Sequence, residues 1–120
     1  MPVSNGITES AIESPDWQLA ADEHKPVSLV VQQRAGVHIF PWMRFVYAEG
    51  NNSIVKLAFA SHMVTVNGQG LAALLAAVAG ERVLRLIEPS EHEAQFGVRG
   101  RGANKYTGPS IQTITVELFK

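Results

Sequence analysis

The chain has 120 residues, of which 46% are hydrophobic and 18% charged, and its formal net charge at pH 7 is −1. This length and composition predict one globular domain with a single modest core. The absence of cysteine excludes disulfides, thiolate metal sites and cysteine nucleophiles. We find neither an apolar run long enough to cross a bilayer nor a signal peptide, so we expect a cytoplasmic protein without membrane contact.

Residues 1–26 are predicted to form a loosely ordered acidic tail, which precedes a single domain over residues 27–120. The tail holds five acidic residues against one lysine, and Trp17 is its main bulky anchor. Pro15 favours a short helical turn over residues 16–23, because proline suits the first position of a helix.

The first part of the domain carries strand patterns. Strands are expected at 27–32, 37–48, 54–60 and 63–66. In the third of these, Val55, Leu57 and Phe59 share one face, as alternation in a strand requires. Pro41 cannot donate to a strand ladder and therefore predicts an edge, a bulge or a break in the second strand.

The segment around Pro41 is rich in aromatic side chains: Phe40, Trp42, Phe45 and Tyr47. We interpret these residues as core, because a small domain needs its large aromatics inside. An aromatic-rimmed interaction surface is the alternative.

One helix is predicted over residues 70–79. Leu71, Leu74, Leu75 and Val78 recur at helical spacing, and Gly80 suits the C-terminal end. A strand is expected at 83–87, a long loop with a short strand at 96–98 over 91–110, and a last strand at 111–119. The order of these elements predicts an α+β fold, in which a mostly antiparallel or mixed β-sheet has the helix packed on one face.

Residues 68–73 read GQGLAA and fit the G-x-G-x-x-G/A form of a dinucleotide-binding loop. Backbone amides at Gly68, Gln69 and Gly70 would face a phosphate, and Glu88 stands 20 residues after Gly68, where an acid binds ribose hydroxyls. Too little chain follows for a doubly wound domain, so a plain strand-to-helix turn is preferred and no cofactor is predicted. Binding of a small anion or nucleotide by these four residues is the alternative.

A glycine-rich segment places Arg99, Arg101, Lys105 and Tyr106 close together in the sequence. Three cations and an aromatic ring suit phosphate contacts and base stacking. Three charges add little affinity for nucleic acid at physiological salt, so a solvated connecting loop is the preferred interpretation. Weak contact with nucleic acid or phosphate through these residues is the alternative.

No metal site is predicted, because none of the histidines shows the spacing of a metal-binding pair. They are His24, His38, His62 and His92. His62 follows Ser61, but neighbouring side chains of an extended segment point apart, so a Ser–His nucleophilic pair is not expected. A catalytic site assembled from distant residues, such as Glu49, His62 and His92, stays open.

These observations favour a non-catalytic binding or assembly module over an enzyme. No acid–base pair, nucleophile or metal set converges in the sequence. A twisted sheet with one helix leaves an apolar face to cover, and self-association covers it. We therefore expect a homodimer, and a different protein is the alternative partner. Membrane contact is not expected, and nucleic acid is not favoured as a partner.

Overall fold

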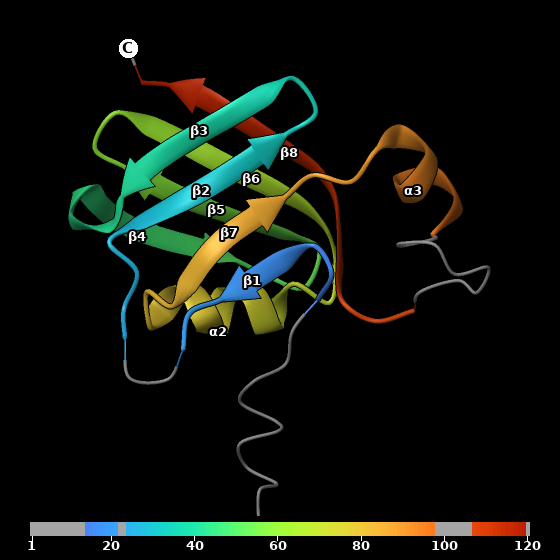
Figure 1. The fold of residues 1–120 in the computed structure, drawn as a ribbon, viewed down its shortest axis with the longest axis horizontal. Coiled ribbons are helices and arrows are strands. Elements are labelled where there is room, and N and C mark those ends of the chain that lie inside the picture. The colour runs from blue at the N-terminus through green and yellow to red at the C-terminus, as the bar shows by residue number, and fades with distance from the viewer. Residues whose placement is uncertain (1–13, 22–23, 98–106, 120) are drawn as a thin grey trace, which may run out of the picture.

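The computed structural model describes residues 14–21, 24–97 and 107–119, whose strands form two four-stranded sheets (Figure 1). The first sheet has the order β1 (Trp17–Leu19), β7 (Val83–Ile87), β2 (Ser28–Gln33) and β3 (Gly36–Pro41). The second has the order β4 (Phe45–Gly50), β5 (Ile54–Phe59), β6 (His62–Gln69) and β8 (Ser110–Leu118). Neighbouring strands run antiparallel, apart from the parallel pair β2 and β7.

Three helical segments complete the described part of the chain: η1 (Trp42–Arg44), α2 (Ala72–Ala79) and α3 (Glu91–Phe96). The α2 helix lies across one end of the two sheets and contacts β4 of one and β7 of the other (Figure 1). Leu71, Leu74 and Val78 point inward from this helix and its first turn and are fully buried. The predicted α+β fold with mostly antiparallel strands and one main helix is confirmed, and its strands divide between two sheets.

The inward faces of both sheets meet in one apolar core. Alternation along β5 buries Val55, Leu57 and Phe59, as predicted from the sequence. The other fully buried residues of the core that lie in strands include Leu29, Val31, Val64, Val66, Val83, Leu86 and Ile111. Because side chains from both sheets and α2 belong to the same cluster, the described strands share one core.

The aromatic segment around Pro41 divides between core and surface. Trp42 and Phe40 are buried, and Phe45 packs against the same cluster, as expected for core residues. Trp42 Nε1 also donates a hydrogen bond to the Val83 carbonyl, which satisfies its polar end. Tyr47 instead remains 47% exposed on β4.

Two local predictions were wrong. Residues 17–19 form strand β1 against β7, where a helical turn was expected, and Trp17 is 2% exposed. Residues 91–96 form α3, where a loop was expected, because Ser90 and Glu93 make a reciprocal capping box that stabilises the first turn. The S-x-x-E spacing that signals such a box was present in the sequence.

None of the helices in the described ranges is both long enough and apolar enough to span a membrane.

Candidate functional site

The glycines of the predicted dinucleotide loop lie where β6 passes into α2. Gly68 and Gln69 end β6 and pair with β8, where Gln69 lies opposite Ser110. A Cβ at Gly68 would collide with the Ser110 carbonyl oxygen, and a Cβ at Gly70, whose φ is +68°, would press on Pro109. Both glycines therefore allow a close approach between two segments of this chain.

Backbone amides around this turn already have partners in the β4–β5 loop. Gly68 N donates to Ser53 O at 3.0 Å. Leu71 N donates to Asn52 O at 3.0 Å, and Ala72 N donates to Asn52 Oδ1 at 3.1 Å. These three amides therefore already have hydrogen-bond acceptors within the protein. This supports the interpretation of the glycine motif as a strand-to-helix turn.

Glu88, the predicted ribose-binding acid, serves a different contact. Its Oε1 accepts the backbone N–H of Arg34 at 2.9 Å, and its Oε2 accepts the backbone N–H of Ile114 at 3.0 Å. The Arg34 guanidinium lies 3.9 Å from Oε2. The carboxylate thus connects the β2–β3 turn of the first sheet to β8 of the second.

The second predicted contact site, made of Arg99, Arg101, Lys105 and Tyr106, lies outside the described residues. Its phosphate or nucleic-acid contact stays a prediction.

The structure corrects one expectation about Ser61 and His62. Their side chains meet, with Oγ and Nδ1 2.6 Å apart, because Ser61 lies in the bend between β5 and β6 and not in the extended strand. The His62 ring lies 5.3 Å from Phe40 and 6.5 Å from His38, between centroids. The rings of His38, Phe40 and His62 thus connect β3 of the first sheet to β6 of the second. The contact between the Ser61 hydroxyl and the His62 imidazole was not expected from the sequence.

The residues proposed for a dispersed catalytic site contact different neighbours. Glu49 lies opposite Lys56 in the β4–β5 pair. His92 packs on Phe96 at 4.8 Å, whereas His62 contacts the Phe40 ring. Within the described ranges, no group of three or more His, Cys, Asp or Glu side chains is placed to hold a metal ion.

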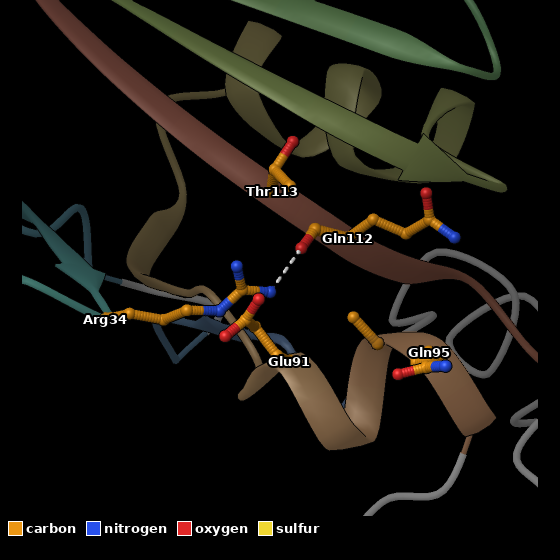
Figure 2. Close-up of a pocket in the computed structure, with 6 residues that line it drawn as sticks. Arg34, Glu91, Gln95, Gln112 and Thr113 are labelled. Atoms are coloured by element: carbon orange, nitrogen blue, oxygen red, sulfur yellow. Dashed lines mark hydrogen bonds between the residues drawn. The ribbon is translucent and has the colours of Figure 1, made fainter.

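A polar pocket lies where α3 approaches β8 and the β2–β3 turn (Figure 2). Its volume is about 300 Å³, and its lining residues are Arg34, Glu91, Ala94, Gln95, Gln112 and Thr113. Glu91, Ala94 and Gln95 share one face of α3 because they are three and four positions apart. The helix, positioned by its capping box, therefore presents a carboxylate and an amide to one hollow.

Arg34 enters this pocket from the β2–β3 turn, and its guanidinium is held by main-chain acceptors. Nε donates to Pro89 O at 2.7 Å, and Nη2 donates to Gln112 O at 3.1 Å, the bond drawn in Figure 2. Arg34 was not predicted as a site residue from the sequence, since carbonyl acceptors carry no residue-specific signal. The pocket is lined by side chains of opposite charge, Arg34 and Glu91, and by the amides of Gln95 and Gln112.

A scan against protein-family models finds no match for this chain, and comparisons with curated proteins and with solved structures find none either.

Proposed function

We propose that the protein is a non-catalytic binding or assembly module that forms a homodimer through the outer face of its first sheet. That face comprises the outward strand positions Gln18, Ser28, Val30, Gln32, Val37, Ile39, Pro41, Arg85 and Ile87, as the strand registers and burial pattern indicate.

The observation that carries the proposal is the outward side of β3, which is apolar although it is exposed. Phe40 points into the core, whereas Val37 and Ile39 point outward and are 58% and 65% exposed. A strand with one solvated face normally alternates apolar and polar residues, and a strand covered on both faces does not. Val30 lies beside Ile39 in the register, so the apolar character continues onto β2.

The opposite surface of the molecule shows the contrast. On the outer face of the second sheet, Thr65 pairs with both Lys56 and Thr115, and Met63 pairs with Glu117. This alternation is what a solvated sheet requires. The second sheet also exposes two apolar side chains, Val46 and Tyr47, on its edge strand β4. The continuity of Val37 and Ile39 with Val30 on the neighbouring strand favours contact through the first sheet.

A second copy of the chain suits this face because the face carries little charge. Arg85 is the one charged residue among its outward strand positions, and its Nη1 donates to Gln32 Oε1 at 2.9 Å. A nearly neutral apolar surface can face its own copy about a two-fold axis without strong repulsion between like charges. Such contact buries the same exposed Val37 and Ile39 side chains on both protomers.

Sedimentation equilibrium of the full chain tests the proposal. We expect the mass of a dimer for the wild type and of a monomer for Ile39→Glu, with unchanged circular dichroism. Thr115→Glu places the same charge on the outer face of the second sheet and should leave the dimer intact. A monomeric wild type at all concentrations, or a dimeric Ile39→Glu variant, overturns the proposal.

Two other interpretations from the sequence remain separable by experiment. Anion or nucleotide binding at Gly68, Gln69, Gly70 and Glu88 predicts a rise in melting temperature with nucleotide. The occupied amides around Gly68 do not favour this interpretation. Nucleic-acid contact through Arg99 and its neighbours predicts a salt-dependent affinity.

A further inference from the structure

The guanidinium group of Arg34 lines the polar pocket beside α3, and hydrogen bonds within the protein hold it in place. Arg34 Nε donates a hydrogen bond to the Pro89 carbonyl, and one N–H of Nη2 donates to the Gln112 carbonyl. A guanidinium has five N–H groups, so three have no hydrogen-bond acceptor within the described part of the chain. The Arg34 side chain is 33% exposed and lines the pocket.

Glu88 does not use up this cation. Both of its carboxylate oxygens accept backbone amides, and the closest guanidinium nitrogen is 3.9 Å away, beyond hydrogen-bond distance. The ion pair with Glu88 partly offsets the positive charge of Arg34, which still lines the pocket. Arg34 therefore combines a fixed orientation with N–H groups that have no acceptor among the described residues. Such a guanidinium can donate two parallel hydrogen bonds to a carboxylate.

A carboxylate faces the same hollow from α3. Figure 2 shows the Glu91 side chain directed toward Arg34, with Gln95 one turn further along the helix. Among the residues that the structure describes, the ion pair of Arg34 is with Glu88, and the Glu91 side chain forms neither an ion pair nor a hydrogen bond. Opposite charges thus line one pocket without contacting each other.

We propose that this pocket binds a small zwitterion of the α-amino-acid class, whose carboxylate binds Arg34 and whose ammonium binds Glu91. A simple anion would be repelled by Glu91, and a simple cation by Arg34. A zwitterion satisfies both charges, because its carboxylate and ammonium sit on one carbon. The volume of about 300 Å³ matches a small molecule of this size. Gln95 adds an amide that can donate to and accept from a polar ligand side chain.

Titration of the ¹⁵N-labelled full chain with L-glutamine, followed by NMR, tests the assignment. We expect saturable shifts of the Ala94, Gln95 and Gln112 amides, with a millimolar dissociation constant. N-acetyl-L-glutamine lacks the ammonium and should bind about tenfold more weakly or worse, which corresponds to about 1.4 kcal/mol. Inorganic phosphate should behave as the acetylated compound does.

Variants separate the two charges. Glu91→Gln changes an exposed helix residue without a described partner, so it should keep the fold and bind L-glutamine about tenfold more weakly. Arg34→Gln should abolish binding, although it also removes contacts of the fold. Glu117→Gln, on the outer face of the second sheet, serves as the control and should bind as the wild type does. Absence of saturation at tens of millimolar L-glutamine overturns the proposal, as does binding of inorganic phosphate to the wild type that is as tight as binding of L-glutamine.

Discussion

Phe40 and Phe59 stack across the interior of the molecule, with ring centroids 4.9 Å apart, and so join β3 of the first sheet to β5 of the second. Both side chains are buried. Trp42 and Phe45 contact the Phe59 ring at 5.7 and 5.6 Å, respectively. Phe59 therefore lies at the centre of an aromatic cluster that connects the two sheets.

Replacement of Phe59 by alanine should lower the free energy of unfolding by about 3–5 kcal/mol, because it removes a buried ring and leaves a cavity. Urea denaturation followed by tryptophan fluorescence measures this change. Phe96→Ala, at a ring that is 48% exposed, should cost about 1 kcal/mol or less. Equal losses for the two variants would contradict the role assigned to Phe59.

Local patterns predicted the elements better than their arrangement. The inward face of β5 and the main helix, which was predicted over 70–79 and spans Ala72–Ala79, follow from periodicities within a few residues of sequence. The division into two sheets depends on pairings between distant segments. Val30 lies beside Arg85 in the parallel β2–β7 pair, and nothing near either residue specifies that partner. Likewise, Asp16 Oδ2 accepts the Ile111 amide at 2.8 Å, which ties β1 to the second sheet.

Two glycines within the described ranges have positive φ and provide a matched pair of variants. Gly70 and Gly97 have φ values of +68° and +71°, so alanine is strained at both. A Cβ at Gly97 would meet nothing within 4 Å, whereas at Gly70 it would meet Pro109. Gly97→Ala should cost about 1 kcal/mol, and Gly70→Ala should cost about 1–3 kcal/mol more through overpacking.

Urea denaturation of both glycine variants provides the measurement. A Gly70→Ala variant as stable as Gly97→Ala would show that the segment at Pro109 can move aside. The close approach at Gly70 would then contribute nothing to the free energy of unfolding. The same variant also bears on the dinucleotide motif, since a structural role predicts lower stability whether or not nucleotide is present.

The candidate site shows a similar limit of sequence reasoning. Glu88 was singled out by its spacing from Gly68, and the structure gives its carboxylate backbone partners at Arg34 and Ile114. Arg34 was missed because its acceptors are carbonyl oxygens, which every residue carries. The α3 helix had a local signature in Ser90 and Glu93, so this part of the pocket was within reach of the sequence.

Asn52 caps α2 from a distant loop, which leads to a third prediction. Its Oδ1 accepts the Ala72 amide, and its carbonyl accepts the Leu71 amide. Asn52→Ala removes the side-chain acceptor and should cost about 1 kcal/mol of stability. Asn52→Asp keeps the oxygen and adds a negative charge at the positive end of the helix, so it should be nearly neutral or stabilising. Thermal unfolding of the two variants decides, and equal destabilisation by both would rule out the cap.

Glu88 provides the last prediction, because its two oxygens bind backbone amides from the two sheets. Glu88→Gln keeps one acceptor and turns the other position into an NH₂ group that faces an N–H donor. The unsatisfied amide should lower the free energy of unfolding by about 1–3 kcal/mol. If the Ile114 side is lost, its amide proton should exchange faster with solvent, since β8 then loses a tie to the first sheet.

Hydrogen exchange measured by NMR distinguishes this role from a general loss of charge. Glu91→Gln removes a carboxylate from the same end of the molecule, where the side chain has no hydrogen bond within the described residues, and should change stability by about 0.5 kcal/mol or less. Unchanged exchange at both Arg34 and Ile114 in the Glu88→Gln variant would mean that the carboxylate does not tie the sheets together. Faster exchange at one or both of these amides, and not elsewhere, would show that the Glu88 carboxylate ties the β2–β3 turn to β8, and thereby fixes the position of the Arg34 guanidinium in the polar pocket.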